Sequence, residues 1–456
     1  MVIGKVFENL LGTFNEETKT TARNESGSFY TPREIVDYMV DASLKEYFKE
    51  KLHSNDTITE EKLDNLFSYS KEEHDFDSEQ VKILMNSINN CKILDPACGS
   101  GAFPMGILNR FLYIMQKLDP DNILWKELQI KKVMEATKIA YGIDNKEKRK
   151  ERLAEIDEVF EMSTGEFSNY ARKLYLIENC IFGVDIQPIA IQISKLRFFI
   201  SLIVDQKTSG NKKNNYNVLP LPNLETKFVA ANTLIGVKRE QGFLADPDIE
   251  LKQNELLYIR HCHFSARYAI EKIHLRRKDE LLSKELSKLL IKDGFYTSSA
   301  AEQLANWNPY DQSKSSDFFD PAWMFGLSNE NTRLNCAGFF DVVIWNPPYV
   351  SAPTMVSINP ENRKAIINSH CYTTLYQKWD LFIPFMDLGL QLLSEKGIFT
   401  MIIPYPFTNQ SYAKKMREFI VNQFNLLEIA YYDTLEHKIC KHLNKNVKHL
   451  NNIPGI

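Results

Sequence analysis

A short string near residue 95 combines residue types that suit a nucleotide-binding turn. The string ILDPACGSGAF, at residues 93–103, predicts an apolar strand ending in Asp95, a turn with Gly99 and Gly101, and a helix from about Ala102. Glycines let the backbone approach a ligand closely, and a helix amino terminus favours negative groups. The string does not match the dinucleotide fingerprint. It therefore predicts a cradle for a different nucleotide-containing ligand.

A second acid is expected at the end of the next strand, where it can accept hydrogen bonds from ribose hydroxyls. The two candidates are Asp144 in IAYGID and Asp185 in IFGVDIQPIAIQISKLRFFISL. We favour Asp185, because Pro188 suits the first turn of a helix and a long apolar segment follows it. The KEKRKER run after Asp144 is instead typical of a solvated helix face. Choosing Asp185 requires an insertion between the two acids.

A second constellation ends another buried strand, FFDVVIWNPPYV at residues 339–350. Pro347 and Pro348 cannot donate backbone hydrogen bonds, and a proline pushes the residue before it into extended geometry. The Asn346 amide oxygen and the Pro347 carbonyl are then free to accept from the two N–H donors of an exocyclic amine. Tyr349 offers a ring face on which a base can stack, worth about 1–3 kcal/mol. This string predicts a pocket for a base.

The upstream string SGSFYTPREIVDYMV predicts a helix with a marked start. Thr31, Pro32 and Glu34 form a capping-box pattern with proline at the first helical position. A helix cap alone does not account for the two aromatic residues that precede it, Phe29 and Tyr30.

Five segments are predicted to be buried strands, and several lead into helical patterns: KILDPACG, IFGVDI, FVAANTLIG, FFDVVIWN and GIFTMIIP. Strands alternating with helices predict an α/β fold with a doubly wound, mostly parallel sheet, in which ligands bind at the carboxyl ends of the strands. Polar, helix-rich stretches at about 111–175 and 250–305 are interpreted as insertions in the sheet domain.

Composition is that of an ordinary globular protein, with 44% hydrophobic and 25% charged residues and a formal net charge of −4. This balance does not favour nucleic acid, although a local basic cleft can occur on an acidic protein. Seven cysteines without a C-x-x-C pair indicate reduced thiols and a cytoplasmic protein. No apolar run approaches a membrane span, and the first residues do not resemble a signal peptide. His261, Cys262 and His263 have no distant partner ligand in the sequence, so we predict no metal site.

The motif pair DPACGSG and NPPY resembles that of amino-methylating DNA methyltransferases, and FYTP ahead of both resembles the gamma arrangement of N6-adenine enzymes. The strings LLGTFNEETKTTARNESGSFYTPREIVDYMV, RKLYLIENCIFGVDIQPIAIQISKLRFFISL, LPNLETKFVAANTLIG and NWNPYDQSKSSDFFDPAWMFG are similar to fused type IIG restriction–modification enzymes and their phage-exclusion relatives. The resemblance runs from about Gly4 to Asp433. It implies a class I S-adenosylmethionine-dependent methyltransferase fold.

The resemblance also implies roles for individual residues. Asn346, Pro347, Pro348 and Tyr349 would hold the target base as the catalytic set. Residues implied to bind S-adenosylmethionine are Asp95, Gly99 and Gly101, Asp185 at its ribose, Asn232 near its adenine ring, and Tyr30, Thr31 and Pro32 near its methionine end.

Two departures from the family pattern stand out. Trp345 replaces the usual glycine before NPPY, where it would either crowd the pocket or pack behind it. The pattern stops near Asp433, before the target-recognition domain of family members, and a nuclease domain would precede residue 1. We therefore expect a truncated core, with a separate component supplying recognition or cleavage.

The expected organisation has five parts. They are an FYTP arm at 1–50, a cofactor-binding half at 90–245 with its insertion at about 111–175, a helical insertion at 246–310, a catalytic half at 311–433, and a divergent tail at 434–456.

The predicted function is site-specific adenine methylation of double-stranded DNA within a restriction–modification or phage-defence system, with no membrane partner. Three alternatives remain: methylation of RNA or of a protein glutamine, N4-cytosine methylation, and a non-catalytic remnant that binds DNA or the cofactor. N4-cytosine methylation more often goes with serine in place of Asn346.

Overall fold

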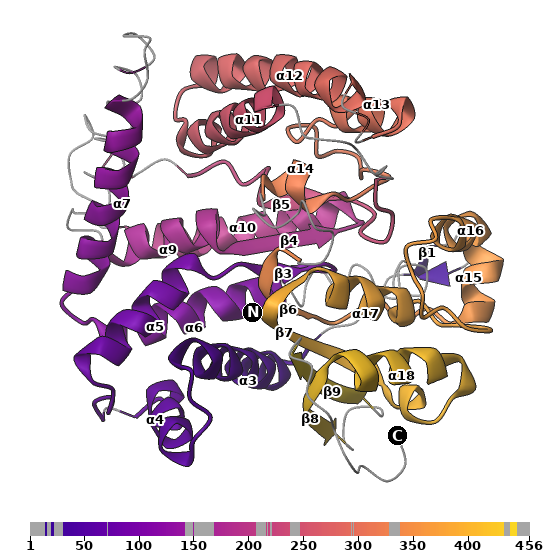
Figure 1. The fold of residues 1–456 in the computed structure, drawn as a ribbon, viewed down its shortest axis with the longest axis horizontal. Helices are drawn as coiled ribbons and strands as arrows, with labels where there is room; N and C mark the ends of the chain where they lie inside the picture. Colours follow the sequence, from indigo (N-terminus) through magenta and orange to yellow (C-terminus); the bar gives the residue numbers. More distant parts are fainter. Residues whose placement is uncertain are drawn as a thin grey trace.

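The computed structural model describes residues 14–15, 20–21, 31–70, 72–141, 149, 168–206, 216, 218, 221–237, 247–292, 294, 296–327, 338–432 and 438–444. Its centre is a seven-stranded sheet with the order β5-β4-β3-β6-β7-β9-β8 (Figure 1). The sheet strands are β3 (Ile93–Asp95), β4 (Ile181–Asp185), β5 (Phe228–Ala230), β6 (Phe340–Trp345), β7 (Leu393–Pro404), β8 (Asn425–Tyr432) and β9 (Lys438–Asn444). A separate two-stranded pair is formed by β1 (Phe14–Asn15) and β2 (Thr20–Thr21).

Strands β5, β4, β3, β6 and β7 pair in parallel, and β9 runs antiparallel to both β7 and β8. This is the strand order of class I S-adenosylmethionine-dependent methyltransferases. The predicted α/β fold with a mostly parallel sheet is therefore confirmed, and the five expected strand segments are β3 to β7.

Two strands of the sheet were not expected from the sequence. Strand β8 follows the last predicted strand segment, and β9 lies within 434–456, where the sequence analysis placed only a divergent tail. That tail contributes β9, which lies between β7 and the edge strand β8 and pairs with both. The division of the chain into five parts stays a prediction.

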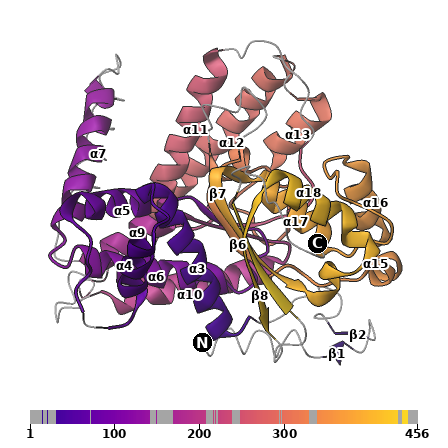
Figure 2. The ribbon, with the colours of Figure 1, turned by 60° about the horizontal axis from the view of Figure 1, so that its bottom comes forward.

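Helices cover both faces of the sheet (Figures 1 and 2). The first face packs against helices that precede or directly follow β3 and β4: α3 (Arg33–Leu52), α4 (Thr57–Phe67), α5 (Ser78–Asn90), α6 (Ala102–Leu118), α7 (Ile123–Tyr141), α9 (Ser168–Asn179) and α10 (Pro188–Val204). The other face carries α11 (Pro247–Ser265), α12 (Ala269–Lys292), α13 (Ser298–Asn306), α14 (Pro321–Phe325), α15 (Ala352–Ile358), α16 (Pro360–Asn368), α17 (Phe382–Gln391) and α18 (Lys414–Gln423). Two short 3-10 helices, η3 (Tyr405–Thr408) and η4 (Ser411–Ala413), lead from β7 into α18.

Alternation along β6 divides its side chains between the two cores. Val342 and Ile344 belong to the core with α3 and α6, whereas Val343 and Trp345 belong to the core with α17. Successive side chains of a strand point to opposite faces, so a sheet buried on both sides needs apolar residues at every position. This explains the continuous apolar run before NPPY.

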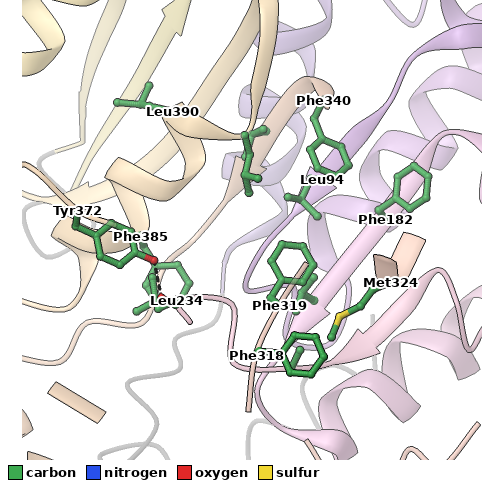
Figure 3. Packing of buried hydrophobic residues seen from close by; sticks show 14 of the residues in the cluster. Leu94, Phe182, Leu234, Phe318, Phe319, Met324, Phe340, Tyr372, Phe385 and Leu390 are labelled. Carbon is green, nitrogen blue, oxygen red and sulfur yellow. Dashed lines mark hydrogen bonds between the residues drawn. The ribbon is translucent and has the colours of Figure 1, made fainter. Parts of the chain in front are cut away.

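The helices of the 246–310 stretch pack into the sheet's own core. Leu256 of α11, Leu286 of α12 and Leu304 of α13 are buried in the same cluster as residues of β4 and β6. Figure 3 shows part of this cluster, with Leu94, Phe182 and Phe340 from three neighbouring strands meeting Phe318, Phe319 and Met324. No helix among the described residues is both long and apolar enough to cross a membrane.

Candidate active site

The predicted nucleotide cradle lies where β3 and β4, which are parallel neighbours, both end. Asp185 closes β4, and its two carboxylate oxygens accept from the backbone N–H of Gly99 (2.9 Å) and of Gln187 (2.8 Å). Asp185 thus ties the glycine turn after β3 to the start of α10. Pro188 is the first residue of α10, as predicted. The competing candidate, Asp144, lies outside the described residues.

Gly99 and Gly101 have left-handed backbone conformations, with φ of +53° and +77°. This region is costly for residues with a Cβ. A Cβ on Gly101 would also lie 2.8 Å from the Ser194 hydroxyl of α10, whereas a Cβ on Gly99 would meet nothing within 4 Å. Gly101 is therefore needed for packing within the protein, and Gly99 borders open space where a ligand can approach the backbone.

Both acids of the cradle are held in environments that disfavour charge. Burial raises the pKa of Asp185 to about 6, against the lowering effect of the bonds from Gln187 and Gly99. Burial also raises the pKa of Asp95 well above its usual range, despite the bond from the Ala97 N–H, and the nearby Asp185 charge adds to this rise. Such perturbed carboxylates gather at functional sites more often than elsewhere. Burial likewise raises the pKa of the Cys98 thiol, which argues against a reactive thiolate here.

Side chains that the sequence analysis did not single out hold the turn from behind. The Ser194 hydroxyl donates to the Gly99 carbonyl (2.9 Å), and Arg197 donates to the Ser100 carbonyl (2.7 Å). The Thr233 hydroxyl donates to the Pro96 carbonyl (2.8 Å), from the loop after β5. Ser194 and Arg197 are three residues apart on α10, so they lie on one face of the helix, and this spacing could have identified them from the sequence. These bonds fix the carbonyls on one side of the turn.

The predicted base-binding motif lies directly beside this cradle, because β6 is the other parallel neighbour of β3. NPPY follows β6, and its first residue contacts the FYTP string: Asn346 Nδ2 donates to the Thr31 hydroxyl (3.1 Å). The Tyr349 hydroxyl lies 2.5 Å from Asn346 Oδ1 and 3.2 Å from the Ile402 carbonyl, with one proton to donate. Both ends of the Asn346 amide are therefore oriented by neighbouring hydroxyls.

The predicted capping box at the start of α3 is wrong. The helix begins at Arg33 with Pro32 as its N-cap, and no side chain caps its first turn. The Thr31 hydroxyl instead accepts from Asn346 Nδ2, so its side-chain contact is with the site rather than with the helix. Thr31 is buried and Pro32 is half-buried beside it. Tyr30 lies outside the described residues.

Trp345 packs behind the motif and leaves the loop uncrowded. Its side chain is fully buried on the α17 face, 5.0 Å from the Phe399 ring in an edge-on arrangement. Gly389 of α17 makes room for it, since a Cβ there would lie 1.9 Å from the indole. Of the two possibilities raised by the sequence, packing behind is the one observed. The half-buried Tyr349 ring contacts the opposite core.

Asn232 lies after β5, and its side chain is engaged within the protein. Its Nδ2 donates to Asn362 Oδ1 of α16 (3.1 Å), and its Oδ1 accepts from the Leu234 N–H (3.3 Å). Figure 3 shows the neighbouring link, in which the Tyr372 hydroxyl donates to the Leu234 carbonyl (2.7 Å). The segment that carries Asn232 is thus tied to the region that follows NPPY.

The two histidines near the end of α11, His261 and His263, make contacts within the protein. His261 pairs with Glu178 (2.5 Å), and the buried His263 accepts from Arg276 (3.1 Å). Burial lowers the pKa of His263 to about 4. Within the described ranges no three His, Cys, Asp or Glu side chains are grouped so that they could hold a metal ion.

The residues of the cradle fit a nucleoside-containing cofactor. The open space at Gly99 gives backbone access, and Asp185 accepts two hydrogen bonds with lone pairs remaining for hydroxyl donors. Strand order together with these two loops defines a class I methyltransferase architecture.

The chain belongs to the Eco57I restriction-modification methylase family, whose model matches residues 179–437, more than half of the 456 residues. Among curated proteins, the "Putative type II restriction enzyme and methyltransferase RM.MjaORFECS2P" of Methanocaldococcus jannaschii is 22% identical over 494 aligned positions, which cover 94% of this chain and 36% of that protein. The chain therefore spans about a third of that relative's length.

Two further similarities are more local or weaker. The type II methyltransferase M.BstVI of Geobacillus stearothermophilus is 38% identical over 92 residues, covering 20% of this chain and 15% of that protein. Among solved structures, the type IIL restriction-modification enzyme MmeI in complex with DNA aligns over 98% of this chain and 40% of that chain, with 10% identity and a TM-score of 0.40. At that TM-score the structural likeness carries no argument, and the family assignment depends on sequence.

Proposed function

We propose that this chain is the catalytic core of a DNA methyltransferase that transfers a methyl group from S-adenosylmethionine to the exocyclic N6 amine of adenine, within a restriction–modification or phage-defence system. One observation carries the proposal: the glycine turn after β3 and NPPY after β6 end neighbouring parallel strands, and Thr31 of FYTP contacts Asn346. Three strings far apart in the sequence thereby meet at one edge of the sheet. Open α/β sheets bind their ligands at this edge.

The cofactor would be held by the β3 side of the site. Asp185 accepts hydrogen bonds and is suited to ribose hydroxyls, and the backbone at Gly99 borders open space. Asp95, Gly101, Asn232, Tyr30, Thr31 and Pro32 complete the proposed cofactor set. When bound, S-adenosylmethionine supplies an activated methyl group on sulfur.

The target amine would be held by the β6 side. A carboxamide oxygen has two lone pairs, so Asn346 Oδ1 can accept from the Tyr349 hydroxyl and still accept from an amine. The Pro347 carbonyl is the proposed second acceptor. Together they orient the nitrogen and increase its electron density, while Pro348 and Tyr349 shape the loop. Alignment of two reactants accounts for much of the rate in such transfers.

Double-stranded DNA is the proposed substrate, and its adenine would be turned out of the stack, at a cost of a few kcal/mol. Similarity to type II restriction enzymes and methyltransferases supports DNA as the substrate class. Asparagine rather than serine at position 346 favours adenine over N4-cytosine. A separate recognition or nuclease component is a further proposed partner.

The test is nucleoside mass spectrometry of duplex DNA incubated with the chain and isotopically labelled S-adenosylmethionine. We expect label in N6-methyladenine, and none with the Asn346→Ala chain. Label in N4-methylcytosine would correct the base. Label in RNA or in a protein glutamine, with none in DNA, would overturn the proposal, as would no transfer to any of these acceptors.

A further inference from the structure

We propose that Asp380 is a positioning residue for the base-binding loop, because its carboxylate fixes the segment that leaves NPPY. The inference deepens the proposed function and depends on it for its catalytic part. Asp380 lies two residues before α17 and is not among the residues that the sequence motifs single out. Its contacts link three segments that are distant in the chain.

The loop needs support from outside, because its own backbone supplies little. Pro347 and Pro348 have no N–H, so two successive residues cannot be held by donating to a neighbouring strand. The upstream end is fixed by the ladder of β6, where Trp345 pairs with Met401 of β7. The downstream end must be held by other contacts, since the chain leaves the sheet at this point.

Asp380 and Leu381 make these contacts through two hydrogen bonds that run in opposite directions. The Ala352 N–H donates to Asp380 Oδ1 (2.9 Å), and the Leu381 N–H donates to the Val350 carbonyl (2.9 Å). Bonds in opposite directions fix both the distance and the orientation of the two segments. The residue just after Tyr349 is therefore held to the start of α17.

The second carboxylate oxygen is also engaged. The Tyr412 hydroxyl of η4 donates to Asp380 Oδ2 (2.7 Å). Burial and this bond raise the pKa of Tyr412 above its ordinary value, so the hydroxyl remains a donor. Hydrogen bonds to a carboxylate are roughly twice as strong as those between neutral groups. Asp380 is thus held from the α18 side while it holds the loop.

If Asp380 had a purely structural role, its loss would lower stability without a specific effect on the loop after NPPY. A second acid, within α17, provides a matched control. Asp387 is a buried acid within α17, seven residues after Asp380, and it accepts from Thr374 and Gln391 rather than from the segment after NPPY. Asp387→Ala also removes the hydrogen bonds of a buried carboxylate, so it should affect stability without loosening the loop. Asp380→Asn keeps an acceptor for Ala352, while Asp380→Ala removes both bonds of the carboxylate.

The experiment combines amide hydrogen exchange of the peptide over residues 349–355 with single-turnover methylation of duplex DNA, on the full chain. For Asp380→Ala we expect exchange of that peptide to speed up at least about tenfold, because local opening sets the exchange rate. Methyl transfer should fall about tenfold to a hundredfold with cofactor affinity within about twofold, the scale for small misplacements of a reacting group. Asp380→Asn should restore most of both.

Unchanged exchange in Asp380→Ala, or equal acceleration in Asp387→Ala, would overturn the inference. The exchange measurement does not require activity. Faster exchange confined to Asp380→Ala therefore supports the positioning role even if the unmodified chain transfers no methyl group. Absence of methyl transfer by the unmodified chain would count against the proposed function but not against the positioning role.

Discussion

The two loops of the candidate site are built in opposite ways. The turn after β3 uses glycines in left-handed conformations, and its main bonds run between backbone groups and residues of the adjoining strand and helix. The loop after β6 uses prolines, and the side chains that bond it or the residues just after it come from outside the motif: Thr31 lies before α3 and Asp380 lies before α17. In the proposed function, the first loop lets a ligand approach the backbone, and the second holds hydrogen-bond acceptors in a fixed orientation.

This difference predicts where each loop is vulnerable. The β3 turn should fail through substitutions within its own string, since its shape depends on its own φ angles. The β6 loop should also fail through remote substitutions that leave NPPY intact. The following predictions test this contrast.

The largest expected effect is on chemistry at the β6 loop. Asn346→Ala removes the proposed acceptor of the target amine, and losing one such group costs about 10²–10³ in rate in comparable sites. Single-turnover methylation of duplex DNA measures it. A loss below about threefold would show that Asn346 is not the acceptor.

Alanine at the two glycines should separate packing from ligand access. Gly101→Ala combines a left-handed φ with a contact of 2.8 Å to Ser194, so we expect its free energy of unfolding to fall by about 1–2 kcal/mol or more. Gly99→Ala carries the backbone strain without the clash, so its stability should fall less and its cofactor affinity more. Chemical denaturation and calorimetry measure the two. The reverse ranking would contradict the assignment of the open space to the ligand.

The contrast also explains how much the sequence could predict. Strands β3 to β7, the glycine turn and the choice of Asp185 follow from local patterns, and Pro188 begins α10 as expected. The Thr31 bond to Asn346 joins segments with no shared local pattern, so the same residues were mistaken for a capping box. Strand β9 was missed because its residues, KICKHLN, do not form an apolar run.

A smaller, remote effect is expected at the arm. Thr31→Val keeps the shape but leaves Asn346 Nδ2 without its acceptor, a loss of about 0.5–1.5 kcal/mol, or up to about tenfold in transfer rate. Thr31→Ser should retain most of the rate, because the hydroxyl remains. Loss of rate in Thr31→Ser with none in Thr31→Val would show that the methyl group rather than the hydroxyl matters.

A further expected effect is a pH dependence at Asp185. Its pKa in the folded chain is about 6, above its ordinary value, so the folded state binds the proton more tightly than the unfolded state does. The contribution to the free energy of unfolding is therefore present at low pH and is lost as pH rises through about 6. Cofactor affinity should change in the opposite sense, weakening as pH falls below about 6, because the proposed ribose bonds need the carboxylate.

Asp185→Asn should flatten both profiles relative to the unmodified chain. Denaturation and calorimetry between about pH 4 and about pH 8, at about half-unit steps, would measure them. Profiles that stay parallel to those of the unmodified chain would assign the titration to another group, such as Asp41, whose pKa burial also raises to about 6.

The most direct test of the account is a calorimetric titration of S-adenosylmethionine into Asp185→Ala and Asn346→Ala, each beside the unmodified chain. The account assigns the cofactor to the β3 side and the target amine to the β6 side. It predicts that Asp185→Ala weakens binding by about 1–3 kcal/mol, the range for hydrogen bonds to a charged group. Asn346→Ala should bind within a few-fold of the unmodified chain. Equal weakening in both variants, or none in Asp185→Ala, would contradict the division of labour between the two loops.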